Sequence, residues 1–301
     1  MKTGLAALVH PRSIAEFFDH YRAGQPFVVH HGGQHTAPLT ELPLLASLDA
    51  LLKSWPSSIQ AHLPDVRDEA SSIQTTSKDA QKLFDVGMGL LFNDADEILP
   101  VLRRWQHDIR KDLGLPDLTY GRCLIYATPS AKGTAAHFDQ NINFVLQIHG
   151  TKVWTLAAND HVVHPMTRHT MGLATDPELA TYAEGVLPSS MPQQSESVVL
   201  APGSLLFVPR GYWHSTEAQD DALSLNFTYT APTWIDLLTA ALRSRLALSA
   251  QWRETADGVS DPAKREAAVQ RFDELLLGLV QDLPHWQAAE ILNATEIDGP
   301  E

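Results

Sequence analysis

Cysteine is almost absent from this chain of 301 residues, and Cys123 is the only one. A single cysteine excludes an intrachain disulfide and any zinc site built from several thiolates of this chain. Long apolar runs are absent as well. The apolar stretch after Gly4 is broken at His10 and Pro11, which makes it too short for a signal-peptide core or a membrane span. We therefore expect a cytoplasmic protein with no membrane segment.

Basic residues are scarce relative to acidic ones. The chain has 22 Lys and Arg against 36 Asp and Glu, a formal net charge of -14. This balance disfavours long-range attraction to nucleic acid or to an anionic membrane, and a cationic or neutral partner is easier to accommodate. The apolar fraction of 44% is sufficient for a buried core in one large or two modest domains.

The hydrophobic periodicity changes twice along the chain. Apolar residues at helical spacing predict helices over 11–23, 41–54 and 95–113, with a short strand over 25–30. Short β-branched and aromatic runs separated by Gly, Pro and Ser then predict strands over 121–127, 142–148, 152–157, 197–200, 204–208 and 223–230. This pattern is typical of a small antiparallel barrel or a double-sheet jelly roll, so we expect a mainly β fold with flanking helices.

Helical spacing returns after Pro232. Asp261-Pro262 predicts the start of a second helix in this segment. The two predicted apolar stripes consist of Ile235, Leu238, Leu242 and Leu246, and of Val269, Phe272, Leu276, Leu279 and Leu283. They require a partner surface, which is either the barrel or a second subunit in a homodimer. We expect residues 1–231 to form one domain and 232–301 a C-terminal helical segment, with an acidic tail from Glu296.

The sequence His137-Phe138-Asp139 supplies an imidazole and a carboxylate two residues apart. On a strand, both side chains point to the same face and can bind one ion. With a second imidazole they form the ligand set that binds non-haem Fe(II) and leaves coordination positions open for substrate and dioxygen. Asn143 and Gln147 share this parity, so we expect them to face the barrel interior while the alternate residues pack against outer helices.

The third metal ligand must come from a distant segment. The candidates are His149, His161, His164, His169 and His214. His214 is favoured because the turns at Pro202-Gly203 and Pro209–Gly211 flank a predicted strand and direct it back inside the barrel. The histidines at 161, 164 and 169 lie on a predicted loop and lack regular ligand spacing.

These residues together resemble the JmjC-type, cupin-like Fe(II)/2-oxoglutarate oxygenases. The resemblance covers roughly residues 12–230 and is closest to the protein and peptide hydroxylases. It is carried by His137-x-Asp139, by Gly203 followed by Pro209-x-Gly211-x-x-His214, and by Asn226. It implies a double-stranded β-helix in which His137, Asp139 and His214 hold Fe(II), with 2-oxoglutarate as cosubstrate.

The resemblance also implies residues that bind the cosubstrate. By the family's pattern Lys152 binds the distal carboxylate of 2-oxoglutarate; the alternative is an exposed strand lysine beside the turn at His149-Gly150. Thr134 matches a position where the family places a hydroxyl for the same carboxylate. Asn143 and Asn226 match amides that line the pocket, or they are core polar groups with satisfied hydrogen bonds.

The chain departs from the family in one respect. Many relatives use an upstream tyrosine on 2-oxoglutarate, and residues 80–90 contain Phe84 but no tyrosine. Tyr126 is a candidate substitute. Basic groups that we place near the mouth of the site are Arg122, Lys132 and Arg210.

The expected function is Fe(II)- and 2-oxoglutarate-dependent hydroxylation of an amino-acid side chain in a protein or peptide, including a peptide natural-product precursor. One alternative is hydroxylation of a free amino acid or small metabolite. Another is a non-enzymatic cupin-like binding module, against which the intact set of three metal ligands argues.

Overall fold

The computed structural model describes residues 3–30, 33–63 and 71–293. They form two compact units. The first consists of Met1–Leu115 and Tyr120–Thr230, and the second of Pro116–Thr119 and Ala231–Glu301, each within the described ranges. Among these residues, no helix has both the length and the apolar character needed to cross a membrane.

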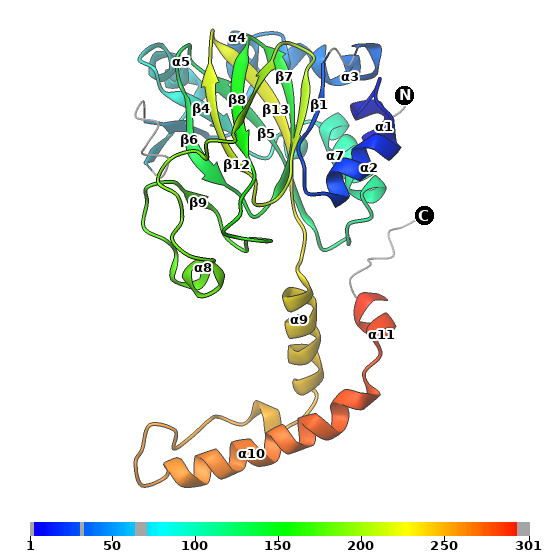
Figure 1. The fold of residues 1–301 in the computed structure, drawn as a ribbon, viewed down its shortest axis with the longest axis vertical. Coiled ribbons are helices and arrows are strands. Elements are labelled where there is room, and N and C mark those ends of the chain that lie inside the picture. Colours follow the sequence, from blue (N-terminus) through cyan, green and yellow to red (C-terminus); the bar gives the residue numbers. More distant parts are fainter. Residues whose placement is uncertain (1–2, 31–32, 64–70, 294–301) are drawn as a thin grey trace. The chain divides into compact units, whose positions relative to one another are not determined.

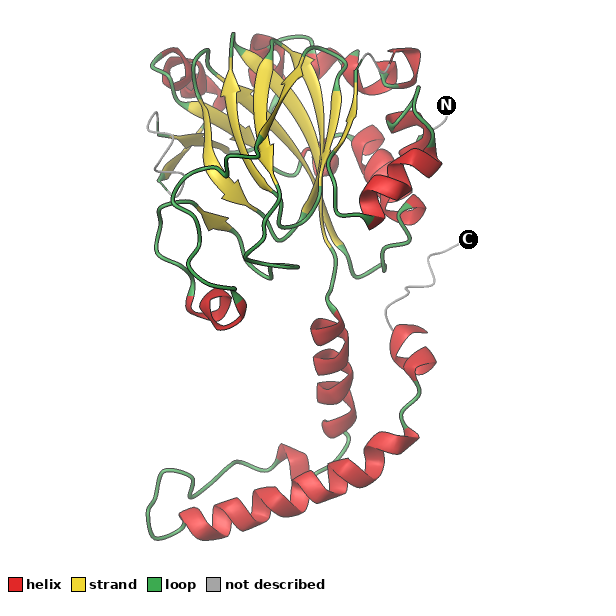
Figure 2. Ribbon diagram, viewed as in Figure 1, coloured by secondary structure: helices red, strands yellow, loops and turns green. Residues whose placement is uncertain are grey.

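Two antiparallel sheets dominate the first unit (Figures 1 and 2). In spatial order, the eight-stranded sheet contains β1 (Phe27–Val29), β11 (Leu205–Val208), β7 (Ile142–His149), β13 (Ala222–Thr230), β5 (Tyr120–Thr128), β4 (Gly89–Phe92), β2 (Ile59–His62) and β3 (Ser72–Thr75). The five-stranded sheet contains β10 (Glu196–Leu200), β8 (Lys152–Ala157), β12 (Trp213–Ala218), β6 (Gly133–Phe138) and β9 (His169–Thr170). The predicted jelly-roll fold with flanking helices is confirmed.

Most helices of this unit come from its first 112 residues. They are α1 (Leu5–Leu8), α2 (Ile14–Arg22), α3 (Ala37–Thr40), α4 (Leu48–Ser54), α5 (Ser77–Asp85), α6 (Ala95–Ile98), α7 (Pro100–Asp112) and, later in the chain, α8 (Pro177–Tyr182), with 3-10 helices at Gly33–His35 and Pro43–Leu45. Ser13 and Glu16 form a capping box that starts α2. The predicted helix over 95–113 is divided between α6 and α7, because Pro100 cannot continue the hydrogen-bond pattern from α6.

Strand parity separates an apolar from a polar face on β7. Phe144, Leu146 and Ile148 join the large core cluster that packs the eight-stranded sheet against the helices. Asn143 and Gln147 are buried on the opposite face, and Val145 lies in a small cluster with apolar residues of the other sheet. The expected polar interior is confirmed.

The chain changes sheets at two corners near the site. His137 is the last but one residue of β6 in the five-stranded sheet, whereas Asn143 is the second residue of β7 in the eight-stranded sheet. The parity argument assumed one continuous strand from His137 onward, and this assumption is wrong. The two side chains face each other from opposite sheets. Likewise, His149-Gly150 connects β7 to β8 across the sheets and is not a hairpin turn, because β7 and β8 do not pair.

The second unit is helical. It contains α9 (Trp234–Leu246), α10 (Arg265–Asp282), α11 (Ala288–Asn293) and 3-10 helices at Gln251–Arg253 and Leu283–His285. The capping box of Thr233 and Asp236 starts α9. Asp261 does not cap α10. Its carboxylate accepts from the Ala263 amide in a turn, and the helix begins at Arg265. The predicted acidic tail from Glu296 lies outside the described residues.

Candidate metal centre

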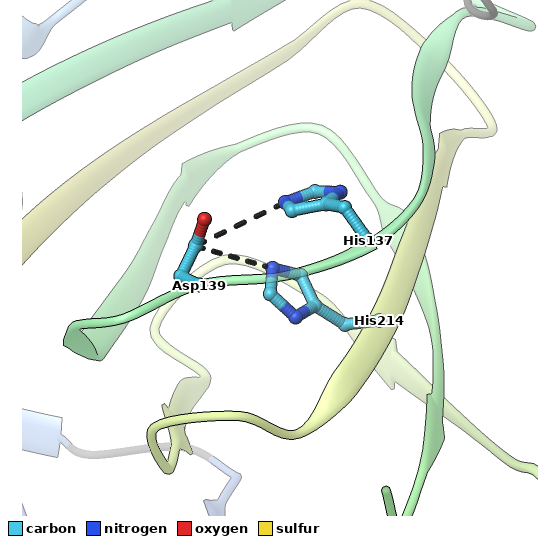
Figure 3. Close-up of side chains that lie close together, drawn as sticks. All are labelled: His137, Asp139 and His214. Atoms are coloured by element: carbon cyan, nitrogen blue, oxygen red, sulfur yellow. Dashed lines mark ion pairs between the residues drawn. The ribbon is translucent and has the colours of Figure 1, made fainter. Parts of the chain in front are cut away.

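Three side chains converge between β6 and β12 (Figure 3). His137 is paired with His214 across these strands, and Asp139 follows β6 directly. Asp139 Oδ2 lies 3.9 Å from His137 Nε2 and 3.6 Å from His214 Nε2. One potential ligand atom from each residue lies within 4.8 Å of the others. Strand register thus brings together the three residues that the sequence indicated as metal ligands.

Both imidazoles present a ring nitrogen suited to a metal. His137 Nδ1 lies 2.7 Å from the carbonyl oxygen of Ala135, and His214 Nδ1 lies 2.9 Å from that of Tyr212. A carbonyl oxygen only accepts, so each Nδ1 must carry the proton and donate it. Each Nε2 of the neutral ring is then an unprotonated donor atom pointing to Asp139.

Burial keeps the imidazoles neutral. Desolvation lowers the pKa of His137 well below its ordinary value, assisted by the nearby His214 and by the positive charge of Arg168. Desolvation also lowers the pKa of His214, and Asp139 opposes this effect. Neutral imidazoles with one carboxylate form a donor set that fits a divalent transition metal.

The Asp139 carboxylate is oriented by two further contacts. Asn143 Nδ2 donates to Oδ2 at 3.1 Å, and Arg168 Nη1 lies 3.5 Å from Oδ1. Thr228 Oγ1 donates to Asn143 Oδ1 at 2.7 Å, which fixes the amide orientation. Asn143 thus lies beside the metal ligands, supporting the carboxylate from behind.

The three ligands open into a cavity of about 670 Å³ between the sheets. The predicted residues Lys152, Thr134, Asn143 and Asn226 all line it, as do Tyr126, Thr128, Thr216, Arg168 and His169. Among the basic groups expected near the mouth, Lys132 lines the cavity. Arg122 instead pairs with Asp94, and Arg210 donates to the carbonyl of Pro165.

Lys152 is the only lysine side chain among the described residues that is fully enclosed, with 4% of its surface exposed. Its Nζ donates to Thr128 Oγ1 at 2.9 Å, and desolvation lowers its pKa to about 8. The alternative of an exposed strand lysine is therefore wrong. A hydroxyl does not compensate a buried positive charge, so this position fits an anionic ligand group.

Polar groups around Lys152 have hydrogen-bonding capacity toward the cavity. Thr134 Oγ1 lies 3.0 Å from Thr216 Oγ1. Asn226 Oδ1 is buried without a hydrogen-bond partner. Such an orphaned acceptor costs free energy unless a ligand or water supplies a donor. Asn226 therefore has hydrogen-bonding capacity left for a ligand or an ordered water.

Several lining residues were missed by sequence reasoning. Thr128 lies two residues after Tyr126 and Thr216 two residues after His214, so each shares a strand face with a residue already considered. The alternation of side chains along a strand is therefore enough to identify Thr128 and Thr216. Arg168 carried no such signal. It precedes His169, which pairs with Phe138 in β9 and is buried, although the sequence indicated a loop there.

Phe84 lies in the helix-facing core and not in the cavity. Tyr126 instead lines it, on β5 beside Thr128. Trp213 and Phe138 pack in a separate apolar cluster on the far side of the metal-ligand strands.

Residues 114–237 match the family model described as the JmjC domain. The chain is 29% identical to the uncharacterized protein YxbC of Bacillus subtilis over 97% of this chain and 89% of that protein. It is 34% identical to human ribosomal oxygenase 1 over 44% of this chain and 19% of that protein, so it spans about a fifth of that relative's length.

The fold is similar to that of YcfD, a ribosomal oxygenase from Escherichia coli solved in complex with cobalt and 2-oxoglutarate. The TM-score is 0.55 at 18% identity, covering 91% of this chain and 68% of that chain. At this identity the likeness concerns the fold.

Proposed function

We propose that the chain, whose residues 114–237 match the JmjC domain model, is a 2-oxoglutarate-dependent dioxygenase with Fe(II) as its metal. We propose further that it hydroxylates an amino-acid side chain of a protein or peptide. A ribosomal protein is the first candidate substrate, because human ribosomal oxygenase 1 and E. coli YcfD are similar to this chain and are named as ribosomal oxygenases.

The observation that carries this proposal is one cavity with two complementary ends. At one end, two neutral imidazoles and a carboxylate offer three ligand atoms. At the other, the Lys152 ammonium is buried beside hydroxyl groups. A dicarboxylate with a chelating end and a distal carboxylate satisfies both ends at once.

The proposed residue roles follow from these positions. His137, Asp139 and His214 hold Fe(II), and Asn143 keeps the Asp139 carboxylate in place. Lys152 binds the distal carboxylate of 2-oxoglutarate, supported by the hydroxyls of Thr134, Thr128 and Tyr126, and Asn226 accepts a hydrogen bond from a bound group or an ordered water. When bound, iron and 2-oxoglutarate activate dioxygen for insertion of one oxygen atom into a C–H bond. The protein itself positions the target carbon and excludes water.

Apolar side chains in the cavity wall support the proposed exclusion of water. Trp154 stacks beside His214, with ring centroids 5.7 Å apart. Leu91 and Leu124 line the same cavity. These side chains form apolar walls beside the polar groups that line the rest of the cavity.

The roles of the two segments of the chain are also a proposal. We propose residues 1–231 as the catalytic domain and 232–301 as a helical segment through which two copies associate. Large apolar side chains on α9 and α10 are exposed, including Ile235 and Phe272, and such surfaces mark association sites. Nucleic acid stays a disfavoured partner because of the acidic balance.

The substrate class is tested by incubating the Fe(II)-loaded protein and 2-oxoglutarate with ribosomes from the same organism and mapping the gain of one oxygen atom by mass spectrometry. We expect modification of a ribosomal protein that disappears with Asp139→Ala. The same modification with that variant, or succinate formation stimulated by free amino acids and not by ribosomes, would contradict the proposal.

A further inference from the structure

Two lysine side chains, Lys132 and Lys152, line the same cavity as the metal ligands. Lys152 is buried, and its Nζ donates to Thr128 Oγ1 at 2.9 Å. Lys132 is half-buried, and its ammonium has no hydrogen bond or ion pair among the residues that the structure describes. The proposed 2-oxoglutarate brings only one carboxylate to this end of the cavity, which compensates one of the two ammonium groups.

Both lysines flank a single residue of β12. Lys152 pairs with Ala218 in the register of β8 against β12. On the other side, the Ala218 amide donates to the carbonyl oxygen of Lys132 at 2.7 Å, and the Ala131 amide donates to the carbonyl oxygen of Ala218 at 2.8 Å. Because neighbouring strands lie about 4.8 Å apart, the Cα atoms of the two lysines are separated by about 10 Å. Their flexible four-carbon stems can therefore reach one small anion together.

The backbone directly before Lys132 adopts a conformation that costs free energy. Ala131 has a φ of 59°, which lies in the left-handed region that a side chain with a Cβ atom disfavours. The hydrogen bonds to Ala218 hold this turn in place, and the turn sets the direction in which the Lys132 side chain leaves the backbone. Strained backbone that the surrounding structure maintains is concentrated at sites of ligand binding, which favours a binding role for Lys132.

The carboxylates of the cavity do not compensate Lys132. Among the described residues that line it, the carboxylates are Asp139 and Asp176. Asp139 belongs to the metal ligands, and Asp176 Oδ1 accepts from the backbone amides of Glu178 and Leu179 at the start of α8. Two neighbouring ammonium groups repel each other. This end of the cavity therefore suits a ligand that brings two carboxylates to it.

We propose that the cavity also binds a tricarboxylate, in competition with 2-oxoglutarate. One carboxylate lies at the metal ligands, the second binds Lys152, and the third binds Lys132. Hydrogen bonds between ammonium and carboxylate groups are about twice as strong as neutral ones, so the third carboxylate adds affinity that a dicarboxylate lacks. The hydroxylase is then inhibited when a tricarboxylate is abundant relative to 2-oxoglutarate. This inference rests on the proposed function.

The test compares tricarballylate with glutarate. Both have a three-carbon chain with a carboxylate at each end, and tricarballylate carries a further carboxylate on the central carbon. Displacement of 2-oxoglutarate from the Co(II)-loaded full chain, followed by calorimetry at fixed ionic strength, gives the affinity of each acid. Lys132→Met removes the charge and keeps the length of the side chain, whereas Lys111→Met removes an exposed charge of α7 away from the cavity. Chelation of Co(II) in solution is the same for all three proteins, so differences among them report the side chains.

For the wild type we expect tricarballylate to bind at least about tenfold more tightly than glutarate. Lys132→Met should reduce this ratio about tenfold and change the affinity for 2-oxoglutarate less than about threefold, and Lys111→Met should preserve both. Equal affinities for the two acids in the wild type, a ratio unchanged in Lys132→Met, or an equal loss of 2-oxoglutarate affinity in that variant would overturn the inference. Failure of the Co(II)-loaded wild type to bind 2-oxoglutarate would instead overturn the proposed function.

Discussion

Asp139 is the residue on which the proposed metal site depends most, because it joins the two imidazoles to a supporting network. Asn143 donates to Oδ2, and Thr228 in turn holds the Asn143 amide. Contacts of this kind orient metal ligands and raise metal affinity.

Replacing the supporting amide should therefore weaken the metal site without removing a ligand. We predict that Asn143→Ala lowers Co(II) affinity about 10- to 100-fold, measured by isothermal titration calorimetry. Thr228→Val is the matched variant, since it removes only the donor to Asn143, and its effect should be smaller. Equal Co(II) affinity in the wild type and Asn143→Ala would show that Asn143 does not support Asp139.

The buried Lys152 ammonium should lower the free energy of unfolding of the ligand-free protein, while it serves to bind 2-oxoglutarate. Its pKa is lowered to about 8 by desolvation, against about 10.4 in an unfolded chain. We predict that Lys152→Met abolishes 2-oxoglutarate binding and raises the free energy of unfolding at pH 7 by on the order of 1–3 kcal/mol, measured by urea denaturation without ligand. A variant that binds 2-oxoglutarate as the wild type does would contradict the role of Lys152.

The pH dependence of this effect has a definite sign. Between about pH 8 and 10.4 the unfolded chain binds more protons at Lys152 than the folded protein does, so wild-type stability should rise with pH in this window relative to Lys152→Met. Below pH 8 the difference should be constant. 2-Oxoglutarate affinity should fall above pH 8, because the ammonium that binds the carboxylate loses its proton. If the difference in unfolding free energy between the wild type and Lys152→Met does not change with pH up to 10, that result would argue against a buried ammonium.

Single residues were predictable where a ligand type or a strand parity identified them. His137, Asp139 and His214 could be selected because imidazoles and carboxylates are rare in alternation inside a barrel. Thr128 had only its parity with Tyr126 as a signal. Arg168 had none, since guanidiniums are common on loops, and only the pairing of distant strands places its side chain in the wall of the cavity.

At the scale of elements, the site depends on the close approach of β6 and β12. Gly133 begins β6, and a Cβ atom there would lie within 1.7 Å of the carbonyl oxygen of Thr216. This position therefore tolerates only glycine without a shift of one strand. The same two strands carry His137 and His214.

We predict that Gly133→Ala separates the strands, lowers the free energy of unfolding by about 1–3 kcal/mol, and weakens Co(II) binding. Gly278→Ala is the control, because Gly278 is helical and a Cβ there meets nothing within 4 Å; it should be neutral or stabilising by up to about 1 kcal/mol. Thermal unfolding and Co(II) titration of both variants give the comparison. Undiminished stability in Gly133→Ala would refute the close-approach argument.

Elements were predictable in proportion to their apolar periodicity. The strands at the centre of the eight-stranded sheet, β5, β7 and β13, were expected with nearly correct bounds. The next strands beyond β5, β4 and β2, and β3 at the sheet edge, were not. β3 is short and largely exposed, so burial imposes little pattern on its sequence. β12 was not predicted as a strand; only the turn at Pro209–Gly211 before it was expected.

At the scale of the whole molecule, the fold class followed from the alternation of short strands and turns, whereas the association state did not. Exposed apolar side chains on α10 include Phe272, at 53% exposure, and Val280, at 62%. A surface of this kind is expected to be buried by another copy of the chain.

We predict that the wild type sediments as a dimer at micromolar concentration and that Phe272→Asp shifts it to monomer, measured by analytical ultracentrifugation. Gln270→Asp adds the same charge at an exposed polar position of α10 and should stay dimeric. A monomeric wild type would mean that this surface serves something other than self-association.

The central claim is that one cavity binds a metal and 2-oxoglutarate together, at opposite ends. It is tested most directly by calorimetric titration of 2-oxoglutarate into the protein with and without Co(II), in the wild type, Asp139→Ala and Lys152→Met. We predict saturable one-to-one binding only in the Co(II)-loaded wild type. Equal binding with and without Co(II), or unchanged binding in either variant, would contradict the account.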